Sequence, residues 1–108
     1  MYYIYLIENV NGNDLKYKIG YTKNLDKRIN QLKTSNPGEL NIIYSYKSEW
    51  GRLLESLIHK KYSNNRVRNE WFNLTKKQVS SFLIDCEKKE KMLNKLKENY
   101  FFRKKYKL

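Results

Sequence analysis

The sequence has little of several residue types, and each shortage excludes a class of protein. It contains one cysteine, one histidine, one proline, four glycines and no alanine in 108 residues. A lone Cys86 can form neither an internal disulfide nor a Cys/His zinc cluster, so we expect a reducing, intracellular location. No run of about 18 apolar residues exists that could cross a bilayer. The apolar opening at 1–7 lacks a basic leader and ends at Glu8, which favours a strand over a signal peptide.

Positive charge and aromatic side chains are abundant instead. The chain has 23 basic and 11 acidic residues, a formal net charge of +12, and ten tyrosines. Such an excess favours a polyanionic partner through steering and counterion release. Charge alone does not distinguish between DNA, RNA and an anionic membrane surface as the partner. The length suits one domain with a modest core, and the aromatic content argues against disorder.

Alternating polarity predicts a hairpin at the start of the chain. Residues 2–8 and 16–22 are the expected strands, joined by a turn at 11–14. In the second strand Tyr17, Ile19 and Tyr21 share one face, whereas Lys18 and Gly20 share the other.

Helical spacing predicts three helices after this hairpin. Residues 25–34 follow Asn24, a good N-cap, and a second helix is expected from about 48 to 62. A third strand at 41–46 lies between them, while 63–69 is expected to be a polar loop. Thr75 and Gln78 form a capping box before a third helix, whose inner face is expected to hold residues 79, 82, 83 and 86. Together they predict an α+β fold.

Specific residues at the joints of this pattern resemble a known nuclease signature. Tyr3-Ile4-Tyr5 and Lys18-Ile19-Gly20 resemble the two halves of the GIY-YIG motif, with Tyr3 and Lys18 in place of its first glycine and second tyrosine. Arg28 follows Gly20 by eight residues, as in that superfamily. The wider pattern is most similar to the T5orf172 branch of phage and viral proteins, through Arg28, Asn36-Pro37, Glu55, His59 and Glu70-Trp71-Phe72. The resemblance covers residues 2 to about 80.

The resemblance implies a fold, an activity and a cofactor. The fold would be a small GIY-YIG-type three-stranded sheet flanked by helices. Residues 1–80 would form the nuclease-like domain, and 81–108 a basic C-terminal helix and tail of the same domain. The activity would be metal-dependent hydrolysis of phosphodiester bonds in nucleic acid, with DNA favoured over RNA and Mg²⁺ or Mn²⁺ as cofactor. The alternative is a non-catalytic nucleic-acid-binding module on the same scaffold.

Two residues of the hairpin are candidates for the chemistry. Tyr5 is the candidate base, and a nearby cation, for which Lys18 is the first choice, would lower the pKa of its hydroxyl from about 10. The alternatives are a core tyrosine and a solvated strand lysine. Gly20 shares the face of Lys18 and would leave space for a phosphate, unless it marks a bulge or a helix contact.

Two helices contribute the other candidates. Arg28 borders the apolar stripe of its helix and would stabilise the phosphate, unless it is a surface arginine paired with Asp26 or Glu55. Glu55 is the candidate metal ligand, since one carboxylate with waters and phosphate oxygens can hold Mg²⁺. His59, at i+4, would bind phosphate, shuttle a proton or serve structure alone.

The remaining candidates have weaker signals. Asn73 and Glu70 are supporting residues, and Glu70 could instead pair with Arg66 or Arg68. The predicted nucleic-acid contacts are Lys18, Gly20, Arg28, Arg66, Arg68, Lys104 and Lys105. Aromatic residues in the basic tail, Tyr100, Phe101, Phe102 and Tyr106, favour the same partner. Apolar spacing along the third helix also permits a homodimer. We expect Tyr5, Lys18, Arg28 and Glu55 to converge on one site.

Overall fold

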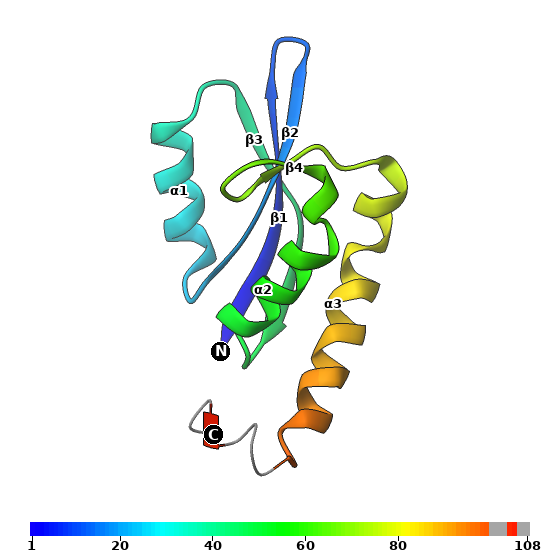
Figure 1. Cartoon of the computed structure of the whole chain (residues 1–108). Coiled ribbons are helices and arrows are strands. Elements are labelled where there is room, and N and C mark those ends of the chain that lie inside the picture. The colour runs from blue at the N-terminus through cyan, green and yellow to red at the C-terminus, as the bar shows by residue number, and fades with distance from the viewer. Residues whose placement is uncertain (100–103, 106–108) are drawn as a thin grey trace.

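A computed structural model describes residues 1–99, 104 and 105 as three helices and a five-stranded antiparallel sheet (Figure 1). The strand order is β3-β1-β2-β5-β4. In chain order the elements are β1 (Tyr2–Asn11), β2 (Asp14–Thr22), α1 (Leu25–Ser35), β3 (Glu39–Ser48), α2 (Arg52–Lys61), the 3₁₀ turn η1 (Ser63–Asn65), β4 (Arg66–Arg68), β5 (Trp71–Phe72) and α3 (Lys76–Leu96). Among the described residues, no helix is both long and apolar enough to span a membrane.

The sheet is larger than the three strands that were expected. The long strands β3, β1 and β2 are extended by β5, which pairs with β2, and by β4 at the edge. The expected loop at 63–69 therefore contains a turn and an edge strand. Strand β4 has only three residues, all exposed, which is too short for a strand pattern to be recognised in the sequence.

The predicted hairpin is present, and its register decides which side chains meet. Tyr5 lies opposite Gly20, and Ile7 opposite Lys18. Because directly opposed residues of adjacent strands point to the same face, Tyr5, Gly20 and Lys18 share one side of the sheet. The turn is tight: Asn11 opposes Asp14, and Gly12 takes the left-handed backbone that such a turn needs, with φ of 62°.

The residues just before the first two helices determine where each helix begins. Asn24 caps α1 by accepting a hydrogen bond from the backbone N–H of Lys27, as predicted. Helix α2 begins at Arg52 rather than near 48, because β3 continues to Ser48 and the chain then turns at Gly51. Gly51 has a φ of 48°, and a Cβ there would lie 2.8 Å from the ring of Tyr2.

Helix α3 opens with the predicted capping box of Thr75 and Gln78. Its inner face differs from the prediction at one position. Leu83 is 37% exposed, and Asp85 lies inside at 5% exposure. Asp85 is tolerated there because it accepts hydrogen bonds from the hydroxyls of Tyr62 and Ser81.

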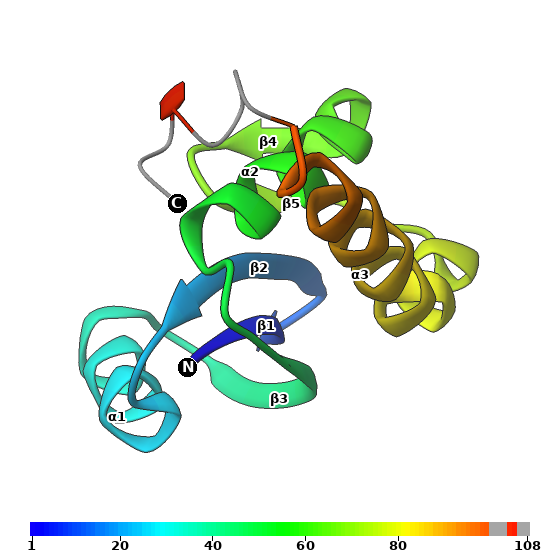
Figure 2. The ribbon, with the colours of Figure 1, turned by 90° about the horizontal axis from the view of Figure 1, so that it is seen from below.

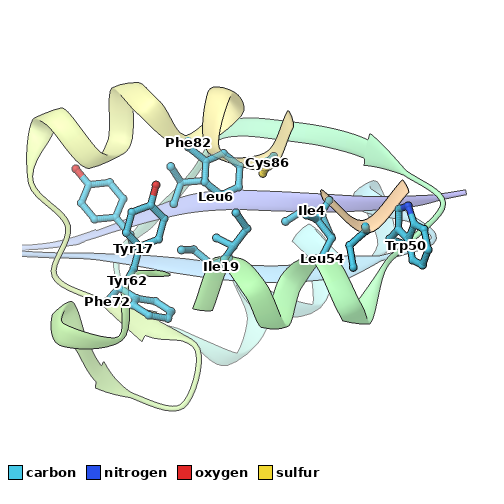
Figure 3. Close-up of a cluster of buried hydrophobic side chains, with 12 residues drawn as sticks. Ile4, Leu6, Tyr17, Ile19, Trp50, Leu54, Tyr62, Phe72, Phe82 and Cys86 are labelled. Carbon is cyan, nitrogen blue, oxygen red and sulfur yellow. The ribbon is translucent and has the colours of Figure 1, made fainter. Parts of the chain in front are cut away.

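The helices divide between the two faces of the sheet. Figures 1 and 2 show α1 on one side, and α2 and α3 on the other. The larger core lies under α2 and α3, and Figure 3 shows its side chains: Ile4, Leu6, Tyr17, Ile19, Trp50, Leu54, Tyr62, Phe72, Phe82 and Cys86. The smaller core lies under α1 and contains Tyr5, Ile7, Ile29, Leu32 and Leu40.

Candidate active site

Tyr5 and Arg28 form a hydrogen-bonded pair on the α1 side of the sheet. Tyr5 is 1% exposed, and its hydroxyl accepts a hydrogen bond of 3.3 Å from Nε of Arg28. The Tyr5 ring lies directly on Gly20, where a Cβ would come within 2.5 Å of Cζ and collide with the hydroxyl. The expected space for a phosphate at Gly20 is therefore filled by this ring. Within the described chain, Arg28 bonds Tyr5 and Gln31 instead of pairing with Asp26 or Glu55.

The cation beside Tyr5 is Arg28, so the prediction of Lys18 in that role is wrong. Burial raises the pKa of the Tyr5 hydroxyl above its usual value, and Arg28 offsets part of that rise. The ammonium of Lys18 pairs with Oε2 of Glu70 at 2.9 Å and lies 5.0 Å from the centroid of the Trp71 ring. Lys18 is nevertheless 8% exposed, so it is no solvated strand lysine.

Glu70 lies among the candidate residues, although sequence reasoning could not assign its role. It pairs with Lys18 and not with Arg66 or Arg68. Its charge also acts on Tyr5, Arg28 and Glu55, raising the pKa of each. The signal in the sequence was its place in the Glu70-Trp71-Phe72 run of the resemblance. In the structure Trp71 pairs with Lys18 across β5 and β2 and so brings Glu70 to the site.

Glu55 and His59 reach the edge of β2 from α2. Strand β5 pairs with β2 only at Tyr17 and Lys18, and the next N–H on this edge, that of Ile19, donates to the carbonyl oxygen of Glu70. There the carbonyl oxygen of Ile19 lies 2.7 Å from Nε2 of His59, and the backbone N–H of Tyr21 donates to Glu55. Side chains from the α2 side thereby meet those of the α1 side around one strand edge.

Glu55 is a buried carboxylate with an unused oxygen. Its side chain is 12% exposed, and Oε2 is buried without any hydrogen-bond partner among the described residues. Burial, and then the charge of Glu70, raise its pKa to about 7, while Lys18, the N–H of Tyr21 and Arg66 pull it down. No group of three or more His, Cys, Asp or Glu side chains in the described chain could hold a metal ion. A cation here would therefore depend on Glu55, water and substrate oxygens, a donor set that suits Mg²⁺.

Both ring nitrogens of His59 have partners. Nδ1 lies 2.8 Å from Nη2 of Arg66, which can only donate, so Nδ1 accepts and Nε2–H donates to Ile19. Burial lowers the His59 pKa, with Arg66 adding to the effect. The 3.9 Å separation from Oε1 of Glu55 is therefore no ion pair. Arg66 also lies 5.5 Å from the centroid of Phe72, so His59 and Phe72 together hold its guanidinium.

The other predicted residues lie away from this cluster. Arg68 lines a separate cavity with Trp71. Asn73 is exposed, and its backbone pairs with Asn65. Lys104 and Lys105 are exposed. The tail aromatics Tyr100, Phe101, Phe102 and Tyr106 lie outside the described residues.

The apolar spacing of α3 that permits a dimer is largely used within the chain. Phe82, Cys86 and Leu93 are buried in the larger core against the sheet and α2. Burial raises the pKa of the Cys86 thiol to about 12, as expected for a small buried hydrophobic residue. A homodimer through this helix stays a prediction, and it would need the opposite face of α3.

Fold and site together define a small basic α+β domain in which a tyrosine–arginine pair, a lysine and a buried glutamate meet at one strand edge. A family model described as the T5orf172 domain matches residues 2–99, and the chain belongs to this family. The match continues past residue 80, where the resemblance was expected to end, and includes α3. No curated protein and no solved structure matches the chain.

Proposed function

We propose that this protein is a metal-dependent endonuclease of the GIY-YIG type that hydrolyses phosphodiester bonds in nucleic acid, with DNA favoured over RNA as the substrate. The observation that supports this most is the buried, unpartnered Oε2 of Glu55 in a domain of net charge +12. A buried carboxylate repels phosphate and costs folding free energy, so a protein that only binds nucleic acid has no use for one.

The residues present fit a divalent cation. Glu55 would hold Mg²⁺ or Mn²⁺ through its unpartnered oxygen, with water and phosphate oxygens as the other ligands. The bound cation would hold the phosphate in place and stabilise the negative charge that develops on it. Glu70 adds a second negative charge close enough to raise the Glu55 pKa, which also favours a cation there.

Tyr5 and Arg28 have complementary tasks in this proposal. The ionised form of Tyr5 would orient the attacking water and take its proton, and Arg28, which already donates to the Tyr5 oxygen, would stabilise the charge that develops. Burial raises the pKa of the Tyr5 phenol and Arg28 offsets only part of that rise, so the contact with Arg28 favours the ionised form without being enough to produce it in the free chain. Arg28 is thus the partner of the base in addition to a contact for phosphate.

Lys18 and Arg66 are the cations that can receive the substrate phosphate. Lys18 is paired with Glu70 and would exchange this carboxylate for a phosphate oxygen. Arg66 is oriented by His59 and Phe72, so little side-chain entropy is lost when it binds. His59 serves by orienting Arg66, since neither of its nitrogens is open to accept a proton.

The second candidate function is a non-catalytic nucleic-acid-binding module. It is favoured by the net charge and by the lack of a three-ligand metal group among the described residues. In that case Lys18 and Arg28 would remain as phosphate contacts. The two functions differ in whether Glu55 matters for anything but stability.

A cleavage assay with one isosteric change decides between them. Supercoiled plasmid, single-stranded DNA and RNA are incubated with Mg²⁺ or Mn²⁺ and, separately, with EDTA. Glu55→Gln should reduce cleavage about 10³-fold or more while nucleic-acid binding stays equal or becomes tighter. The control is Glu39→Gln, an exposed glutamate on β3 that loses the same charge. Cleavage by Glu55→Gln at the parental rate would leave only the binding module.

A further inference from the structure

A cavity outside the site described above lies on the α1 side of the sheet. It has a volume of about 190 Å³, and its wall includes Asn9, Lys16, Asn36, Pro37, Arg68 and Trp71. Two features of the sequence that the proposed mechanism leaves unused, Asn36-Pro37 and Trp71, come together here although Trp71 follows Pro37 by 34 positions. They do so because the end of α1 and the β4–β5 pair both flank the outer half of the hairpin.

The strand register connects this cavity to the candidate active site. Gly20, Lys18 and Lys16 alternate along β2, so they point to one face and lie about 6.8 Å apart from one to the next. Trp71 pairs with Lys18 across the strands, and Arg68 pairs with Trp71. The cavity therefore begins one side-chain step beyond Lys18, on the face where Tyr5 and Arg28 meet.

The lining has the groups that recognise a nucleotide. Trp71 is half-buried, with the Lys18 ammonium over its ring, and can stack on a base. Within the described part of the chain no hydrogen bond or ion pair engages the Arg68 guanidinium, which can therefore bind a phosphate. Lys16 contributes less, because Asp14 lies 3.2 Å from its ammonium.

The two asparagines shape the cavity and leave acceptors in its wall. Asn9 donates through Nδ2 to the carbonyl oxygen of Pro37, and Asn36 donates through Nδ2 to that of Leu32. Their amide groups are thus fixed, and each keeps Oδ1 as an acceptor for the edge of a base. The volume is below the roughly 300–1,000 Å³ of pockets for drug-sized ligands, so it suits a single base, with the sugar and phosphate at its rim.

We propose that this cavity binds the nucleotide unit next to the phosphate that is cleaved. The base packs against Trp71, and its own phosphate is held by Arg68. This inference rests on the proposed function, because it places nucleic acid along the row from Lys18 to Lys16. It assigns Arg68 and Trp71 to positioning of the strand, at a subsite distinct from Glu55 and Tyr5.

Nuclear magnetic resonance of the ¹⁵N-labelled full chain tests the site without any cleavage. Thymidine 5′-monophosphate, thymidine and inorganic phosphate are titrated separately into the metal-free protein to millimolar concentrations. The nucleotide should shift the indole N–H of Trp71 and the side-chain amides of Asn9 and Asn36, while the indole N–H of buried Trp50 stays unchanged. Phosphate should shift Arg68 but not the Trp71 indole. A nucleotide that leaves Trp71 and Arg68 unshifted would overturn the proposal.

Substitution of Arg68 gives a second, independent measurement. Arg68→Ala should weaken binding of a short single-stranded oligodeoxynucleotide about 5–10-fold and reduce the slope of log affinity against log salt by about one. Arg52→Ala removes the same charge from an exposed position at the start of α2 and should change neither quantity. Equal effects of the two substitutions would show attraction by net charge alone and overturn the subsite.

The outcomes separate this inference from the proposed function. Shifts at Trp71 in a protein that cleaves nothing would support the cavity as a nucleotide site and reject the nuclease. Metal-dependent cleavage by a protein in which the nucleotide shifts neither Trp71 nor Arg68 would support the nuclease and reject the cavity as a nucleotide site.

Discussion

The two faces of the sheet have opposite characters. The α2–α3 side buries a large apolar core in which Leu6, Ile19, Leu54 and Phe82 are fully inaccessible. The α1 side has a smaller core, and at its border Arg28 donates to the hydroxyl of Tyr5 and Lys18 pairs with Glu70. Most of the buried apolar surface therefore lies on one face, and the candidate site lies on the other face and at the edge of β2.

The alternation of a single strand produces this separation. Along β2, Tyr17 and Ile19 point to the larger core, whereas Lys18 and Gly20 point to the site. A slip of one residue in the register would exchange the two sets, so the apolar pattern fixes the position of the polar groups as well. Substitutions on the two faces should accordingly affect different measurements.

The largest effect is expected from a cavity in the larger core. Phe82→Ala should lower the free energy of unfolding by about 3–5 kcal/mol, because a fully buried aromatic ring is lost. Urea unfolding followed by circular dichroism measures this, and cleavage per folded molecule should stay close to that of the parent. Leu83→Ala, at a position 37% exposed on the same helix, is the control and should cost less than about 1 kcal/mol. Equal losses would mean that α3 packs differently.

Gly20→Ala is the matching change on the α1 side. Its Cβ would overlap the Tyr5 ring, which must move and lose the hydrogen bond from Arg28. We expect cleavage to fall about 10²-fold, in the range for removing one positioned group. The same substitution in a Tyr5→Phe background should cost much less, because the hydroxyl it displaces is already gone. Full additivity of the two losses would argue that Gly20 acts apart from Tyr5.

The sequence alone predicted those parts of the site that depend on local pattern. Alternation in β2 placed Lys18 and Gly20 on one face, and the N-cap Asn24 fixed the phase of α1 and so the border position of Arg28. The prediction that Tyr5, Lys18, Arg28 and Glu55 would converge used these phases, and the structure brings the four together around one strand edge.

Long-range pairing set the limit of prediction. Strands β4 and β5 have three and two residues, too few to show a period, and their pairing with β2 is what brings Glu70 to Lys18. Local pattern does not reveal that Lys18 pairs with Glu70, so it leaves Lys18 as a candidate neighbour of Tyr5. The contact between Arg28 and Tyr5 joins positions 23 residues apart and depends on how α1 packs, which no local pattern encodes.

Glu55→Gln is expected to raise the free energy of unfolding, in contrast to Phe82→Ala, and by a smaller amount. The folded protein holds Glu55 at a pKa of about 7, above the value near 4.3 of an unfolded glutamate, so the native state favours the protonated form. The stabilisation that protonated Glu55 gives to the folded state is fully present below the pKa of the unfolded chain and is lost as the pH rises through about 7. Glu55→Gln should therefore stabilise the protein by roughly 1–3 kcal/mol at pH 8 and by almost nothing at pH 4. Urea unfolding at both pH values, with Glu39→Gln as the control, measures the difference.

The smallest expected effect is a shift in the pH dependence of cleavage, and it tests the charges around Glu55. Metal binding needs the ionised carboxylate, so kcat/KM should rise as the pH passes through about 7. Glu70 raises this pKa and Lys18 lowers it. Glu70→Gln should therefore move the midpoint down by about half a pH unit to one unit, and Lys18→Gln should move it up by a similar amount.

The direction in which each midpoint moves is more informative than the absolute kcat/KM of either variant. Lys18→Gln also removes a phosphate contact and lowers kcat/KM at every pH, but this loss leaves the midpoint in place. Glu39→Gln changes net charge as Glu70→Gln does and should leave the midpoint unchanged, since Glu39 is exposed on β3. Midpoints that move in the same direction for Glu70→Gln and Lys18→Gln would mean that another group controls the profile, and Glu55 would lose its place as the titrating metal ligand.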